Sequence, residues 1–106
     1  MKFLTIATFK DTFSALPKDE KIKQTISAVE YIMGIKKKMG DNFHFYGTVG
    51  WNRTVSIGEY DSVEEYYQSL QSPTTLEGFT NYECYALIEA DEKFLKTYLK
   101  QMKAAK

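Results

Sequence analysis

A strand, a turn and the start of a helix follow one another in the stretch Arg53-Thr54-Val55-Ser56-Ile57-Gly58-Glu59-Tyr60-Asp61-Ser62-Val63-Glu64-Glu65. Val55 and Ile57 alternate with smaller polar residues, which is typical of a β-strand with one apolar side. Ser62 and Glu65 have the S-x-x-E spacing of a capping box, which satisfies two unpaired amide groups at the start of a helix. The stretch therefore predicts a strand over residues 53–60 that leads directly into a helix.

The chain after this junction predicts an amphipathic helix, a loop and another strand. An apolar and aromatic stripe at spacings i, i+3, i+4 and i+7 consists of Val63, Tyr66, Tyr67 and Leu70. We expect this stripe to point inward, and Pro73 to end the helix. Residues 73–81 form a loop long enough to act as a flap or to cross to a neighbour. Residues 82–88 then read as the fourth strand.

The chain before the junction predicts two further strands. Residues 42–48 alternate, with Phe43 and Phe45 on one side and His44 and Tyr46 on the other. They should pair with residues 53–60 as an antiparallel hairpin. Residues 3–9 are apolar on both sides, as expected of a central strand that is covered on both faces.

A long helix is expected between the first two strands, after a loop over residues 10–16. Pro17 suits the first helical position, and Gly40 is a typical C-cap after the cations of residues 36–38. The apolar residues of this helix recur at spacings of four, three and four, at Ile22, Ile26, Val29 and Met33. Ile32 and Met39 add to them.

A last helix begins after the cap residue Asp91. Its apolar stripe consists of Phe94, Leu95, Tyr98, Leu99 and Met102. The complete order is then β, α, β, β, α, β, α within one domain over residues 1–106. This order predicts an α+β, ferredoxin-like βαββαβ fold, with a four-stranded antiparallel sheet, two helices on one face and an extra C-terminal helix. The second face needs cover from the last helix and a partner sheet, so we expect a homodimer or larger assembly.

Charge and composition exclude several partners. Fourteen basic residues balance fourteen acidic ones, whereas a nucleic-acid binder concentrates positive charge against phosphates. Residues 53–60 also lack the basic, aromatic signature of an RNA-binding strand on this fold. No apolar run approaches the ~20 residues that span a bilayer. We therefore expect neither a nucleic-acid partner nor a membrane partner.

The residues that bind metals and cofactors are scarce. One histidine and the single Cys84 do not make a zinc site, and the glycines of the hairpin do not form a phosphate loop. We expect no metal and no cofactor. A lone cysteine forms no internal disulfide, and the start of the sequence lacks a signal-peptide pattern, so the expected location is cytoplasmic.

Glu59 is the candidate catalytic residue. It continues the alternation of Val55 and Ile57, so we expect it to point toward the helix-covered side. Burial there would raise its pKa and allow proton transfer near neutral pH. Tyr66 and Tyr67 could hydrogen-bond its carboxylate and orient it toward a ligand. The alternative is a solvated carboxylate at the end of a strand.

Candidate ligand-binding residues gather around the hairpin, at His44, Tyr46, Trp51 and Arg53. His44 has the side chain whose ordinary pKa is closest to neutrality. Arg53, the only arginine, lies next to Trp51 and could bind an anionic group. The alternatives are polar contacts at a subunit interface for His44 and Tyr46, and stabilisation of the turn for Arg53.

From about Gly47 to Ala90 the chain resembles the muconolactone isomerase family and the wider dimeric α/β-barrel superfamily. The resemblance rests on residues 54–65, on Leu70-Gln71-Ser72-Pro73 with the strand after it, and on the opening Met1-Lys2-Phe3-Leu4. Tyr67 stands where the isomerases carry a histidine, and residues 73–79 replace their apolar loop. The resemblance implies a dimeric α/β barrel with a pocket between sheet and helices.

The resemblance also implies a function. It points to a protein that binds a small organic acid or aromatic compound and performs cofactor-free isomerisation or oxygenation on it. The rival interpretation is a non-enzymatic ligand-binding or assembly module. A cavity lined by Glu59, Tyr66 and Tyr67 would favour the first, and a filled core the second.

Overall fold

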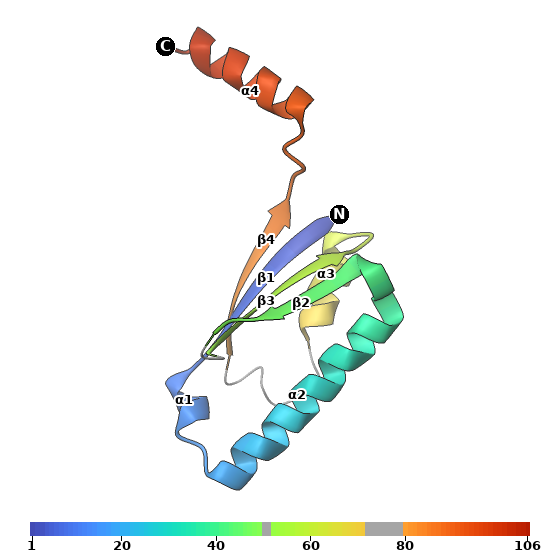
Figure 1. The fold of residues 1–106 in the computed structure, drawn as a ribbon, viewed down its shortest axis with the longest axis vertical. Helices are drawn as coiled ribbons and strands as arrows, with labels where there is room; N and C mark the ends of the chain where they lie inside the picture. Colours follow the sequence, from blue (N-terminus) through green and yellow to red (C-terminus); the bar gives the residue numbers. More distant parts are fainter. Residues whose placement is uncertain (50–51, 72–79) are drawn as a thin grey trace.

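The computed structural model of the chain describes residues 1–49, 52–71 and 80–106. Its single sheet has the strand order β2-β3-β1-β4 (Figure 1). The strands are β1 (Lys2–Phe9), β2 (Phe43–Gly47), β3 (Arg53–Glu59) and β4 (Thr80–Leu87). All three neighbouring pairs are antiparallel. The predicted α+β class and four-stranded antiparallel sheet are confirmed, and the order is compatible with a ferredoxin-like fold.

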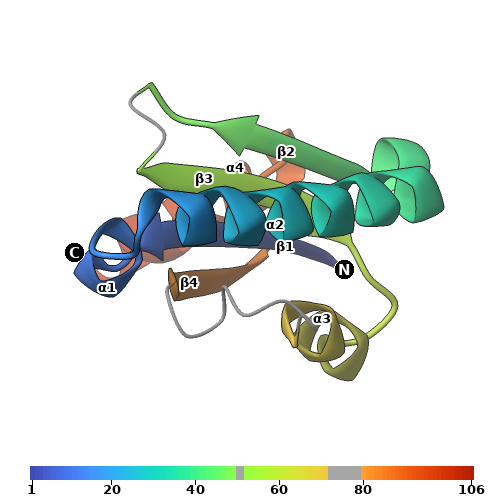
Figure 2. The same cartoon turned by 90° about the horizontal axis from the view of Figure 1, so that it is seen from below.

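One face of the sheet is covered by helices α2 (Lys18–Met39) and α3 (Val63–Leu70). Figure 2 shows α2 lying over β1 and β3 and running along their direction. The covered face carries Phe3 and Thr5 of β1, which are buried, and Gly58 of β3, which lies opposite Phe3. Because side chains alternate along a strand, Leu4, Val55 and Ile57 lie on the opposite face.

Helix α2 begins one residue later than predicted and ends at the predicted glycine. Pro17 precedes the first helical residue instead of occupying it, and Gly40 ends the helix with φ of 58°, a conformation that favours glycine. The Lys36 ammonium donates hydrogen bonds to the carbonyls of Gly40 and Phe43, both at 2.7 Å. A short 3-10 helix η1 (Gly40–Asn42) then leads into β2.

The loop prediction for residues 10–16 is partly wrong, because Asp11–Ser14 forms the short helix α1. The amide of Ala15 donates to the carbonyl of Asp11 at 3.0 Å, which closes one helical turn. The rings of Phe9 and Phe13 stack with centroids 4.8 Å apart. That aromatic contact holds the turn against the end of β1.

Helix α3 begins as predicted, at the cap residue Ser62. Its hydroxyl accepts a hydrogen bond from the Glu65 amide at 3.1 Å. The Glu65 carboxylate accepts in return from the amide of Asp61, one residue before the usual capping-box partner, at 3.2 Å. Of the predicted inward stripe, Tyr66 is buried and Leu70 half-buried.

The other half of that stripe prediction is wrong, since Val63 and Tyr67 are exposed. Helix α3 is only eight residues long, and it contacts the sheet through the i, i+4 row that contains Tyr66 and Leu70. The row that contains Val63 and Tyr67 consequently faces away from the core.

The buried core is a cluster of three aromatic rings. Phe3 and Tyr66 stack with centroids 4.1 Å apart, and Tyr60 meets the edge of Phe3 at 6.0 Å. A Cβ atom on Gly58 would lie 2.6 Å from the Tyr60 ring. Glycine is therefore required where this ring lies across β3.

The four-three-four stripe of α2 faces away from the sheet. Ile22, Ile26, Val29 and Met33 are between 48% and 64% exposed. The sheet side of α2 instead carries Gln24, Ala28, Tyr31, Ile32 and Ile35. The repeating spacing thus belongs to an outer surface of the helix.

Helix α4 (Glu92–Ala104) lies beyond the end of β4, away from the sheet (Figure 1). Its apolar stripe is exposed over Phe94, Leu95, Tyr98, Leu99 and Met102. The radius of gyration is 17.5 Å, against roughly 13 Å for a compact chain of this length. Within the described residues, no helix has the length and apolar character needed to cross a membrane.

Loss of the Ser62 cap should weaken the fold measurably. We expect Ser62→Ala to lower the free energy of unfolding by about 1 kcal/mol, because the Glu65 amide loses its acceptor. Urea denaturation measures the change. Ser27→Ala, at an exposed position inside α2, is the control and should cost nothing. Equal stability of the two variants would show that the cap does not contribute.

Candidate functional site

A cavity of about 150 Å³ lies between the covered face of the sheet and helices α2 and α3. Its apolar wall includes Phe9, Ala28, Ile32, Ile35, Phe43 and Phe45. A cavity of this volume with apolar walls is large enough for one benzene-sized molecule. Among the described residues the core is therefore not fully packed, which leaves space for a small ligand.

Hydroxyl groups supply the polar part of the cavity wall. The Thr5 and Tyr66 hydroxyls are 2.5 Å apart and form a buried hydrogen bond. On the α2 side, the Tyr31 hydroxyl donates to the Ser69 carbonyl at 2.9 Å. Because a hydroxyl both donates and accepts, this wall can satisfy a carbonyl or a hydroxyl of a bound molecule.

Tyr66 is the most strongly perturbed group at the cavity. Burial raises the pKa of its phenol well above the ordinary value, and a hydrogen bond with Cys84 raises it further, whereas the bond with Thr5 lowers it. Cys84 lies opposite Thr5 on the neighbouring strand β4. Tyr66 consequently keeps its proton at neutral pH and acts as a neutral hydrogen-bonding group.

The described side chains that line this cavity are all uncharged. None of the described residues that line it is acidic, basic or a histidine. Across residues 1–49, 52–71 and 80–106 no three metal-binding side chains come together. The arrangement can hold an uncharged molecule by shape and hydrogen bonds, but it offers no carboxylate or imidazole for proton transfer.

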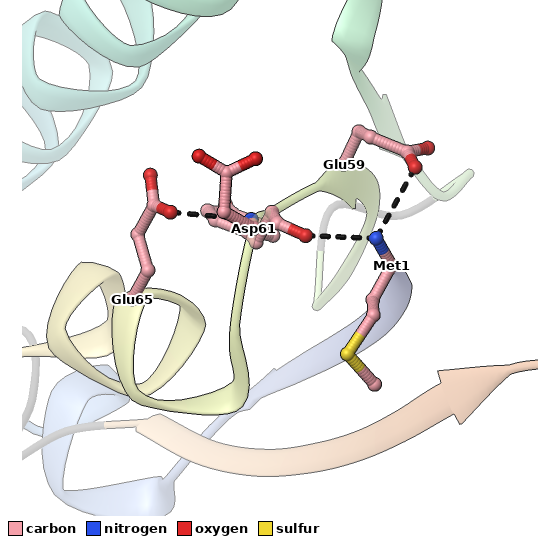
Figure 3. A network of polar contacts seen from close by, with 5 residues as sticks. Met1, Glu59, Asp61 and Glu65 are labelled. Carbon is pink, nitrogen blue, oxygen red and sulfur yellow. Dashed lines mark hydrogen bonds and ion pairs between the residues drawn. The ribbon is translucent and has the colours of Figure 1, made fainter.

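Glu59 does not line this cavity, and it borders a separate open hollow that Tyr31 of α2 and Glu65 of α3 also line. It shares a side with Val55 and Ile57 as expected, but the helices cover the other side of β3. Its carboxylate is exposed and lies 3.3 Å from the Met1 amino group, which also donates to the Tyr60 carbonyl (Figure 3). The structure thus places Glu59 as the solvated end of a strand.

The remaining predicted site residues do not converge. Tyr66 lies at the cavity, whereas Tyr67 is exposed on the outside of α3. His44 and Tyr46 are exposed and border an open groove between α2 and β2. Arg53 is exposed at the start of β3. Trp51 falls outside the described residues.

The cavity residues that sequence reasoning missed are Thr5, Tyr31 and Ser69. Thr5 looked like one more member of an apolar strand, although a polar residue inside a central strand signals a buried hydrogen bond. No comparable signal exists for Ser69, because its backbone carbonyl makes the contact.

Comparison of the chain with models of known protein families and with curated protein sequences gave no match.

The raised pKa of Tyr66 predicts a stability change at high pH. The unfolded phenol ionises near pH 10, whereas the folded one stays protonated. The stabilisation is therefore present below pH 10 and is lost as the pH rises above it. Between pH 9 and 11 the free energy of unfolding, measured with urea, should decline less for Tyr66→Phe than for the unmodified protein. The difference should be up to about 1.4 kcal/mol per pH unit. Tyr46→Phe, which removes an exposed phenol, is the control and should behave as the unmodified protein does.

Proposed function

We propose that this protein binds a small uncharged molecule, of the size of one aromatic ring, in the cavity between its sheet and helices. The observation that carries the proposal is the pairing of an apolar cavity of about 150 Å³ with the hydroxyls of Thr5 and Tyr66. Ligand sites commonly combine apolar walls with a few placed polar groups. An aromatic alcohol, phenol or ketone has the matching chemistry.

The geometry favours an aromatic compound over the organic acid that the family resemblance allows. A carboxylate needs a cation or several donors when it leaves water, and no cationic side chain among the described residues lines the cavity. Isomerisation or oxygenation of the bound molecule remains part of the proposal only if the Tyr66 hydroxyl turns from its bonds with Thr5 and Cys84 to donate to a carbonyl. Glu59 has no role in it.

We also propose that a second copy covers the open face of the sheet, as in the dimeric α/β-barrel superfamily. This face carries apolar side chains in register, with Leu4 opposite Ile57 and Ile6 opposite Val55. The chain exposes 8212 Å², whereas a compact protein of 12.3 kDa exposes roughly 6,100 Å². The excess of about 2,000 Å² is of the size that subunits of permanent dimers bury.

Binding should depend on the volume of the cavity. We expect benzyl alcohol or phenol to raise the melting temperature and to shift amide resonances of cavity residues. Ala28→Leu should abolish both effects, because the larger side chain fills the space beside Ile32. Ser27→Leu, the exposed neighbour in sequence, should leave binding unchanged.

The hydroxyl pair should affect only ligands that have a polar group. Tyr66→Phe should lower the affinity for benzyl alcohol by roughly 2- to 13-fold and leave the affinity for toluene almost unchanged. Equal binding of benzyl alcohol to the unmodified protein, Ala28→Leu and Tyr66→Phe would place the ligand elsewhere and contradict the proposal.

Assembly should depend on the open face and on α4. Sedimentation at micromolar concentration should report a dimer or larger species, and Val55→Lys should dissociate it, because a cation would then be buried in the interface. Removal of residues after Ala90 should weaken the assembly, because the exposed stripe of α4 is lost with them. A 12 kDa monomer for the unmodified protein would refute the dimer.

A further inference from the structure

The outer surface of α2 has the pattern of a helix-pairing seam. Ile22, Ile26, Val29 and Met33 recur at spacings of four, three and four, which is the repeat of core positions in a coiled coil. All four side chains are about half-exposed or more. The cavity takes its α2 wall from other positions, such as Ala28 and Ile32, so the seam has no partner within the described chain.

The apolar surface continues from the seam onto the edge of the sheet. An open groove between α2 and the edge strand β2 is lined by Met33 from the helix and by Phe45 and Tyr46 from the strand. Phe45 and Tyr46 are both exposed. In Figure 2 this strand forms the border of the sheet. Adjoining exposed apolar side chains on a small chain are a candidate interaction site.

We propose that α2 pairs with α2 of a second copy of this chain, antiparallel and across a two-fold axis. In such a pair the seam residues form layers symmetric about the middle of the seam. Ile26 packs against Val29 of the second copy, and Ile22 packs against Met33. Every layer is filled by apolar side chains, and each contact occurs twice, as two-fold symmetry requires.

The charges beside the seam select this orientation. Lys23 and Glu30 are seven residues apart and flank the same side of the seam. In an antiparallel pair this flank meets itself, so Lys23 faces Glu30 of the second copy at both ends of the interface. Neither side chain forms an ion pair within the part of the chain that the structure describes.

A parallel pair lacks this complementarity. It would bring Thr25 beside Glu30 and Ile32 beside Lys37, which leaves charges without opposite partners. A partner of another kind would need its own seam with matching charges, whereas a second copy supplies both. These two features make the second copy the occupant that fits.

The α2 pairing is independent of the proposed dimer through the open sheet face. Helix α2 lies on the covered face, and Leu4 and Val55 lie on the other. Both interfaces can therefore form at once, and together they produce a species larger than a dimer.

Charge reversal tests the pairing directly. Lys23→Glu and Glu30→Lys each place like charges opposite one another, so each should raise the dissociation constant of one association step by roughly tenfold or more in sedimentation equilibrium. The double variant Lys23→Glu/Glu30→Lys restores opposite charges and should regain the mass of the unmodified protein. Lys38→Glu, on another side of α2, is the matched control.

A second variant, Ile26→Glu, tests the apolar contacts between the two helices. Ile26→Glu should abolish the same association step while circular dichroism shows unchanged helix content, since the side chain is exposed in the single chain. The proposal is overturned if the single reversals and Ile26→Glu leave the mass unchanged, or if the double variant associates no better than the single ones. If Val55→Lys changes the mass of the assembly and the α2 variants do not, the subunits associate through the open face and not through α2.

Discussion

The ring of Tyr66 stacks on the ring of Phe3 with 4.1 Å between their centroids, and the buried aromatic cluster and the attachment of α3 to the sheet depend on this contact. Phe3 belongs to β1, which pairs with β3 on one side and β4 on the other. Tyr66 belongs to α3, so the stack attaches this helix to the central strand β1. Tyr60 packs on both rings, in the space that Gly58 leaves open.

The same tyrosine also defines the polar end of the cavity. Its ring contributes to the aromatic cluster, and its hydroxyl reaches Thr5 two residues further along β1. The cavity extends from this point toward α2, where Ala28 leaves space that a larger side chain would fill. Stability and the proposed ligand binding therefore both involve Tyr66.

The chain is too small to cover all of its apolar surface. Two helices cover one face of the sheet, and within the described residues three apolar surfaces stay exposed: the open face, the outer seam of α2 and the stripe of α4. A small domain buries a modest share of its surface on folding, and assembly is a common way to bury more. The extended shape of the single chain is consistent with a subunit whose remaining contacts come from other copies.

Local patterns in the sequence were sufficient to predict most of the helices and strands and several of the residues at which they begin or end. The Ser62 cap, the Gly40 C-cap and the Asp91 cap, whose carboxylate accepts from the Phe94 amide, depend on neighbours within a few residues. The alternation along β3 was also predictable, because it follows from the period of a strand. Of the described residues that the sequence suggested for a site, only Tyr66 lies at the cavity.

What the sequence determined by itself was therefore the order of the elements and which residues share a side. Which side the helices cover was decided by the tertiary structure. Val55 and Ile57 are more apolar than Thr54 and Ser56, so pattern alone assigned them, and Glu59 with them, to the helix side. The helices instead cover the side of Thr54, Ser56 and Gly58, where the Tyr60 ring has space. Alternation is a property of one strand, whereas the choice of face depends on how rings from distant segments pack together.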